Sequence, residues 1–276
     1  MPVGPSLLAF DTSTEAMAVA ACGPAGDAAW AGPGGAAASA RLLPRALAGL
    51  AQTGAALADV DAIAFGAGPG AFTGLRTACA VAQGLGFGLG RPLLAIDSLM
   101  QVAEAARGGA LDRDAHLWVA MDARMDEVYA AAYRLDEAGA GWEVVVAPAL
   151  YTLPALRARW ADAPPGQVAG SAPGVFGDRL PLAGARLLRA AGGGEPGAGV
   201  DRAEALLRLA RRAWAAGLHL DPADARPVYL RDKVALTTAE RAERAAAAGA
   251  AGGTGDAGAE HAGRAGQQPA GARAAA

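Results

Sequence analysis

The chain has 276 residues, of which 53% are hydrophobic, and a formal net charge of −3 at pH 7. The length suggests two domains, and the charge excludes a broadly cationic surface, so any contact with RNA would be local or made through a partner. No basic segment precedes an apolar core at the N-terminus, and no stretch of about 18 uncharged, large apolar residues occurs. We therefore expect a cytoplasmic protein without a signal peptide or membrane span. Cys22 and Cys79 alone predict no disulfide framework.

An internal repeat opens each half of the sequence. The segments Leu7–Ala21 and Leu117–Tyr133 each consist of an apolar run, an Asp, a few polar residues and a second apolar run. The aspartates are Asp11 and Asp122. The repeat predicts two related halves that each begin with a β-hairpin.

Helices and strands alternate after the first hairpin, which indicates an α/β fold. The predicted elements, in chain order, are a helix capped by Ser39, a strand from Ala62, a glycine turn at 68–70, a helix over 73–88, a strand over 92–96, and a helix capped by Asp97 or Ser98 that ends at Ala106. The segment 107–114 is the expected boundary, and an amphipathic helix from Asp201 belongs to the second half. No large apolar residue follows Leu236, so we expect the rest of the chain to be disordered.

The glycine turn between 65 and 74 is compatible with two roles. Backbone N–H groups of such a turn, and of the helix after it, can cradle a phosphate or acyl group. Alternatively, the glycines let the helix pack closely on a strand. The turn lacks a Walker lysine, since Leu75 follows Gly74, and its glycines miss the spacing of the dinucleotide fingerprint. The pattern alone leaves both roles open.

Four segments together resemble the signature blocks of the TsaB (YeaZ) family. They are "LLAFDTSTEAMAVA", "GAGPGAFTGLRTACAVAQGLGFGLGRPLLAIDSL", "MDARMDEVYAAAY" and "PVYLRD", in the family's order. The resemblance implies an α/β, actin-like ATPase (ribonuclease H-like) fold with two related lobes. We expect an N-terminal lobe over 1–106, a C-terminal lobe over 107–236 and the disordered, Ala/Gly-rich tail over 237–276.

The same resemblance implies a function in tRNA modification. TsaB is a subunit of the bacterial machinery that forms N6-threonylcarbamoyladenosine at position 37 of tRNA. The chain would be a non-catalytic dimerisation subunit without a cofactor or metal, paired directly with TsaD and joined by the ATPase TsaE. It would reach tRNA only indirectly, and alone it could form a homodimer. The alternative is an ATP-dependent phosphotransferase or hydrolase of the actin-like superfamily.

The loops that bind nucleotide in active members of that superfamily are altered in this sequence. Active members have glycines in both hairpins, whereas the turns here read "DTST" and "DARMDE", and Arg124 and Met125 occupy space that a triphosphate needs. Asp11 could hold Mg²⁺ through water, but a lone Asp at a strand end is more typical of a turn cap. We interpret these residues as vestigial nucleotide-type loops: Asp11, Thr12, Ser13, Gly68, Pro69, Gly70, Thr73, Gly74 and Arg76.

The sequence has no recognisable catalytic or metal centre. TsaD holds its metal through two histidines one helical turn apart, whereas His116, His219 and His261 have no partner at that spacing. Ala38 stands where many TsaB members keep one His. A peptidase label has been used for the wider family, but no pair of nucleophile and base supports it.

Two helices in the first half are candidates for the contact with TsaD. The helix over 73–88 is apolar around its whole circumference, so a second surface must cover it. That cover is either a partner protein or a second layer of the chain's own core. The family resemblance favours the partner, and the residues expected in the contact are Leu42, Leu43, Leu47, Leu50, Ala78, Val81, Ala82 and Leu85.

Overall fold

The computed structural model describes residues 4–107, 111–182, 184–189 and 199–231, and the tail expected over 237–276 lies outside them. Two five-stranded sheets form the framework. The first sheet contains β1 (Leu7–Asp11), β2 (Ala16–Gly23), β3 (Gly26–Pro33), β4 (Ala62–Gly68) and β5 (Leu93–Asp97). The second contains β6 (Leu117–Asp122), β7 (Glu127–Leu135), β8 (Trp142–Thr152), β9 (Gln167–Ala169) and β10 (Arg186–Leu187).

The two sheets share one strand topology. The strand order is β3-β2-β1-β4-β5 in the first sheet and β8-β7-β6-β9-β10 in the second. In each sheet the first three strands are antiparallel, and the last two run parallel to the first strand. This duplication confirms the two related lobes, each opening with a hairpin, and the actin-like α/β fold.

The four predicted helices are present in the predicted order, with one correction at a cap, and the second lobe contains two further helices besides. The helices are α1 (Ala38–Gln52), α2 (Phe72–Leu89), α3 (Ser98–Ala106), α4 (Leu153–Asp162), α5 (Ala172–Phe176) and α6 (Val200–Ala215), with short 3-10 turns η1 (Gly35–Ala37), η2 (Leu57–Asp59), η3 (Gly177–Arg179) and η4 (Pro222–Asp224). Asp97 caps α3, since its carboxylate accepts from the backbone N–H of Leu99 (2.8 Å) and Met100 (3.3 Å). Ser39 is not a cap, because η1 leads directly into α1 and places Ser39 inside the helix.

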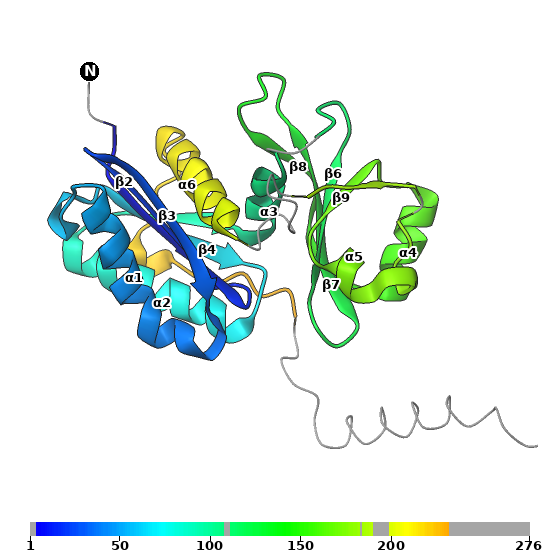
Figure 1. Cartoon of the computed structure of the whole chain (residues 1–276), viewed down its shortest axis with the longest axis horizontal. Coiled ribbons are helices and arrows are strands. Elements are labelled where there is room, and N and C mark those ends of the chain that lie inside the picture. The colour runs from blue at the N-terminus through cyan, green and yellow to red at the C-terminus, as the bar shows by residue number, and fades with distance from the viewer. Residues whose placement is uncertain (1–3, 108–110, 183, 190–198, 232–276) are drawn as a thin grey trace, which may run out of the picture. The chain divides into compact units, whose positions relative to one another are not determined.

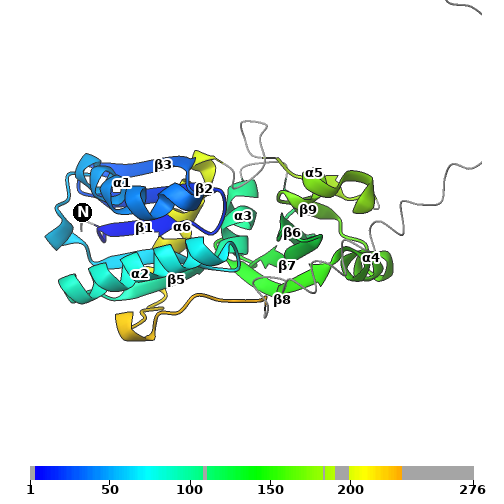
Figure 2. The same cartoon turned by 90° about the horizontal axis from the view of Figure 1, so that it is seen from below.

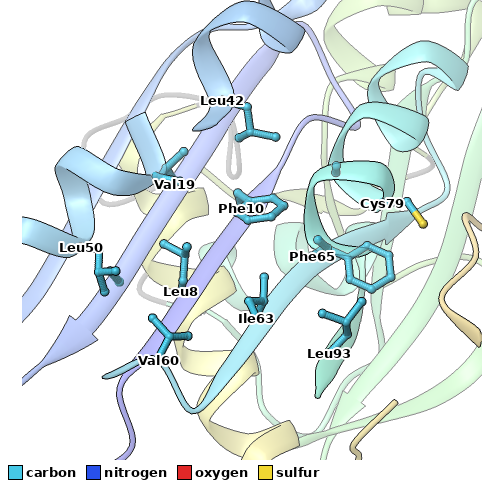
Figure 3. Packing of buried hydrophobic residues seen from close by; sticks show 14 of the residues in the cluster. Leu8, Phe10, Val19, Leu42, Leu50, Val60, Ile63, Phe65, Cys79 and Leu93 are labelled. Carbon is cyan, nitrogen blue, oxygen red and sulfur yellow. The ribbon is translucent and has the colours of Figure 1, made fainter. Parts of the chain in front are cut away.

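The central strand β1 supplies two different cores, because successive side chains point to opposite faces of a sheet. Leu8 and Phe10 pack against α1 and α2, whereas Leu7 and Ala9 pack against α6. Figure 3 shows the first of these cores, with Leu42 of α1 directed into it. Both faces of the first sheet are therefore covered by helices.

The boundary between the lobes differs from the expected one. The helix α6 falls within 107–236, yet its Leu206 and Ala210 pack in one cluster with Leu7 of the first sheet. Figures 1 and 2 show α6 on the face of that sheet opposite α1 and α2. The chain stays at the first sheet after α6, where Leu220 bridges to Leu93. The amphipathic pattern of α6 predicts a helix with one buried face, but it does not specify which sheet that face covers.

The helix α3 connects the two lobes. Its Leu99 packs in one cluster with Val119 of β6. Glu104 is fully buried and forms ion pairs of 2.7 Å with Arg208 and Arg212 of α6. Burial opposes the ionisation of Glu104, but the hydrogen bonds from both arginines outweigh it and keep the pKa of the carboxyl below its usual value. Glu104 therefore remains a charged link between α3 and α6.

Candidate functional site

The glycine turn packs directly against the turn of the first hairpin. The backbone N–H of Ala71 donates to the carbonyl of Ser13 (2.7 Å), and the Thr12 hydroxyl donates to the carbonyl of Gly74 (2.6 Å). A Cβ added to Gly74 would lie 1.8 Å from the Thr12 carbonyl oxygen, and one added to Gly70 would lie 2.4 Å from that of Ser13. Only glycine fits at such contacts, which supports close packing as the role of the turn.

Asp11, at the end of β1, is completely buried and surrounded by donors. Its carboxylate accepts hydrogen bonds from the backbone N–H of Ser13 (2.6 Å), the Ser98 hydroxyl (2.8 Å) and the Gln101 side-chain amide (2.7 Å). The Arg202 guanidinium of α6 forms an ion pair of 2.5 Å with the same carboxylate. The residue that could coordinate a metal in this fold is thus occupied by groups of its own chain.

Arg202 is almost entirely buried and directs several donors at the first hairpin. Besides Asp11, its guanidinium donates to the hydroxyl of Ser13 (2.6 Å) and to the hydroxyl of Thr14. Burial opposes the ionisation of Asp11, but Arg202 and the hydrogen bonds from Ser13 and Ser98 outweigh it and hold the pKa of Asp11 below its usual value. The carboxylate therefore stays ionised.

Arg202 is a site residue that the sequence motifs do not reveal, because it lies 191 positions from Asp11. The sequence feature that could have revealed Arg202 is the helical periodicity of α6. Arg202 falls in register with Leu206, Leu209 and Ala213, which are all buried on α6. A lone arginine in the apolar stripe of a helix indicates a buried anionic partner, and here that partner is Asp11.

The residues interpreted as vestigial loops do not form a single site. Those gathered around the Asp11 contacts are Asp11, Thr12, Ser13, Gly68, Pro69, Gly70 and Gly74. Thr73 and Arg76 are instead exposed on α2. Arg76 donates from Nε to the Tyr229 hydroxyl (3.0 Å), so it contributes nothing to the surroundings of Asp11.

The turn of the second hairpin contacts the turn of the first. Arg124, Met125 and Asp126 adopt positive φ angles of 64, 59 and 59°. Arg124 forms ion pairs of 3.3 Å with Asp122 and with Glu15 of the first hairpin turn. Because Arg124 and Glu15 are largely exposed, their pair contributes little stability. It does place the Arg124 side chain between the turns of the two hairpins.

A comparison with known proteins identifies the family. The Escherichia coli (strain K12) protein named tRNA threonylcarbamoyladenosine biosynthesis protein TsaB is 34% identical over 204 residues, which cover 71% of this chain and 81% of the relative. The chain belongs to the TsaB family. A protein of the same name from Haemophilus influenzae is 42% identical over 124 residues, covering 45% of this chain and 52% of that relative.

A solved structure and a family profile agree with membership of the TsaB family. A Pseudomonas aeruginosa crystal structure, described as an uncharacterized protein with similarity to peptidase YeaZ, has a TM-score of 0.69 and 38% identity over 82% of this chain and 100% of its own. The profile of TsaD, described as tRNA N6-adenosine threonylcarbamoyltransferase, matches residues 35–156. This TsaB-family chain is therefore also similar, over part of its length, to TsaD.

Neither a metal centre nor a membrane span occurs among the described residues of this TsaB-family chain. In that part of the chain, no group of three or more His, Cys, Asp or Glu side chains could hold a metal, and no helix could span a membrane. His116 and His219 are exposed, and His261 lies outside the described residues. Ala38 is buried at the start of α1.

Half of the residues expected in the TsaD contact lie in the core, which corrects the prediction for them. Leu42, Leu50, Ala78 and Ala82 are at most 2% exposed and pack in the cluster beneath α1 and α2. They cannot form a contact surface. On α2, small and medium apolar residues occur on every side, so the periodicity gives little contrast between the inner and outer faces. On α1, Leu42 and Leu50 share the buried face at helical spacing, which the sequence pattern could have indicated.

The other residues expected in the TsaD contact keep an accessible surface. Leu43 and Leu47 are each 39% exposed, and Val81 and Leu85 are partly buried. Phe87, which was not among the expected contact residues, is 61% exposed.

Two glycines on the outer side of α2 have no packing role within the described chain. A Cβ added to Gly84 or Gly88 would meet nothing within 4 Å. Each of these glycines costs the helix about 1 kcal/mol relative to alanine. Within the described part of the chain, no close contact at Gly84 or Gly88 offsets this loss of helix stability.

Proposed function

We propose that this chain is the non-catalytic, partner-binding subunit of the machinery that forms N6-threonylcarbamoyladenosine at position 37 of tRNA. The names of its relatives support the pathway. In this proposal TsaD carries the metal and the transfer reaction, the ATPase TsaE joins the pair, and tRNA is reached through the complex. The chain acts in the cytoplasm and needs no cofactor of its own.

The ion pair between Asp11 and Arg202 is the observation that carries the non-catalytic role. A carboxylate that serves a nucleotide-bound Mg²⁺ must be free to coordinate the metal or its waters. Freeing Asp11 would break a buried ion pair, which costs about 3–5 kcal/mol. Arg202 provides a fixed internal cation beside the carboxylate that would have to serve the metal.

The proposed docking surface for TsaD is the outer side of α1 and α2. We call it the α1–α2 face, and it consists of Leu43, Leu47, Val81, Gly84, Leu85, Phe87 and Gly88. Adjacent helices that expose large apolar side chains beside small residues are typical of protein contacts. The same face could pair two copies of the isolated chain until TsaD displaces one of them.

Titration of the isolated chain with ATP and Mg²⁺ will give no measurable heat of binding. The expected reason is that Asp11 is already neutralised by Arg202 and that the glycine turn is filled by Thr12 and Ser13. Isothermal titration calorimetry measures this directly, with TsaE as a positive control. Tight binding accompanied by phosphate release would contradict the proposal and favour the alternative, an ATP-dependent phosphotransferase or hydrolase.

A further inference from the structure

Arg76 lies in an exposed aromatic stack that joins two of the sequence blocks. Its guanidinium carbon is 3.9 Å from the centre of the Phe72 ring and 5.9 Å from that of the Tyr229 ring. The two rings are 5.1 Å apart. Phe72 and Arg76 come from the first two turns of α2, and Tyr229 comes from the "PVYLRD" segment. The stack thus brings together residues that are 153 positions apart.

The stack orients Arg76 without using its full hydrogen-bonding capacity. Nε donates to the Tyr229 hydroxyl at 3.0 Å, which fixes one edge of the guanidinium. Among the described residues, no carboxylate forms an ion pair with Arg76, and the terminal nitrogens have no hydrogen-bond acceptor. A guanidinium held against the Phe72 ring keeps its planar pair of donors while losing less side-chain entropy on binding.

The stack borders the α1–α2 face on the side of Phe87. At about 100° per residue, Arg76 lies about 20° from Phe87 and about 80° from Gly84 around α2, whereas Val81 and Leu85 lie on the other side of the helix. Arg76 and Gly84 are exposed, and Phe87 is 61% exposed. A protein that covers the Phe87 side of the α1–α2 face would therefore reach Arg76 in the second turn of α2.

We propose that Arg76 binds the carboxylate of an acidic side chain on the protein that docks on the α1–α2 face. This inference rests on the proposed function, in which that protein is TsaD. A planar guanidinium matches a carboxylate with two parallel hydrogen bonds. Arginine and tyrosine beside aromatic rings are also the residue types that dominate binding energy at protein interfaces.

A protein carboxylate fits these observations better than the phosphates of RNA. Sequence-independent binding to RNA requires several cations along the backbone. Arg76 lies against the Phe72 ring and beside Tyr229, and the nearby Arg231 is already paired with Glu127 at 2.7 Å. Arg226, in the segment that carries Tyr229, is a second exposed arginine. Two exposed arginines, of which one is oriented against an aromatic ring, suit one carboxylate better than a row of phosphates.

Calorimetry with purified TsaD, at low and high salt, tests the proposal. Arg76→Ala will lower the affinity by about 10- to 100-fold and flatten its salt dependence. Arg76→Lys will recover only part of the loss, because an ammonium cannot make the paired contact. Tyr229→Phe, which removes the acceptor that orients Nε, will cost less than Arg76→Ala. Arg157→Ala is the matched control, since Arg157 is an exposed arginine on α4 in the other lobe.

The outcomes separate this inference from the proposed function. If the wild-type chain does not bind TsaD, the proposed function fails and this inference fails with it. If the wild-type chain binds and Arg76→Ala binds equally well while its circular dichroism is unchanged, only this inference is overturned. Normal TsaD affinity with weakened tRNA binding by the assembled complex would assign Arg76 to a phosphate instead. If removal of the residues after 231 mimics Arg76→Ala, the chain's own tail is the occupant, and the inference is also overturned.

Discussion

Leu47→Glu will weaken binding of this chain to TsaD by about a thousandfold and leave the isolated chain folded. Leu47 is 39% exposed on α1, so in the free chain a glutamate at this position keeps its contact with water. In the complex the same carboxylate would be buried without a partner, which costs several kcal/mol. A loss of about 4 kcal/mol corresponds to about a thousandfold in affinity. Calorimetry against TsaD measures the affinity, and circular dichroism of the free variant measures its folding.

Two matched variants control this experiment. Leu42→Glu lies on the same helix but is fully buried, so it should unfold the chain before any binding can be measured. Val144→Glu introduces the same charge at a position that is 51% exposed on β8 of the other lobe, and it should change neither folding nor affinity. If Leu47→Glu is folded and binds normally, TsaD docks elsewhere. If it is unfolded, the outer side of α1 belongs to the core.

Arg202→Met will lower the free energy of unfolding by about 3–5 kcal/mol. Methionine fills much of the same volume but leaves Asp11 buried without its counter-ion. Removing the charge of Asp11 as well, in the double variant Asp11→Asn with Arg202→Met, should restore a large part of the loss, since no buried charge then lacks a partner. Urea denaturation followed by circular dichroism gives the free energies.

The control for Arg202→Met is Arg211→Met on the same helix. Arg211 pairs with Asp27 at 2.5 Å, but both side chains are more than 40% exposed, so its loss should cost no more than about 1 kcal/mol. Equal losses of unfolding free energy in the two variants would show that the buried ion pair of Arg202 stabilises the chain no more than the exposed pair of Arg211.

Acid should reduce the difference between the wild type and Arg202→Met. The pKa of Asp11 is lowered in the folded chain, so the stability that its ion pair provides is present above the ordinary aspartate pKa. It is lost as the pH falls through the folded-state value. Denaturation midpoints of the two proteins should therefore converge below about pH 4. A difference that stays constant at pH values well below about 4 would contradict the ionised state of Asp11.

The features that depend on neighbouring residues could be predicted from the sequence. The hairpins at Asp11 and Asp122 follow from two short repeats, and the helix expected over 73–88 is α2, at Phe72–Leu89. The capping of α3 by Asp97 likewise needs only adjacent residues.

Contacts between distant residues could not be predicted in the same way. The partner of Asp11 is 191 positions away, on a helix whose pattern does not say which sheet it covers. The inner and outer faces of α2 were also indistinct, because alanine and glycine are compatible with either environment. Only the packing distinguishes Ala78, which is fully buried, from Gly84, which is exposed.

The rate of threonylcarbamoyl transfer by a reconstituted complex that contains Asp11→Asn tests the non-catalytic role most directly. The variant should be supplied at saturating concentration and below its own melting temperature, so that lost stability does not reduce the amount of complex. Because Asp11 is buried against Arg202 and serves only the fold in this account, we expect a rate within about twofold of the wild type, whereas loss of a catalytic carboxylate costs about a hundredfold or more. A folded, TsaD-bound variant that no longer supports any transfer would contradict the account.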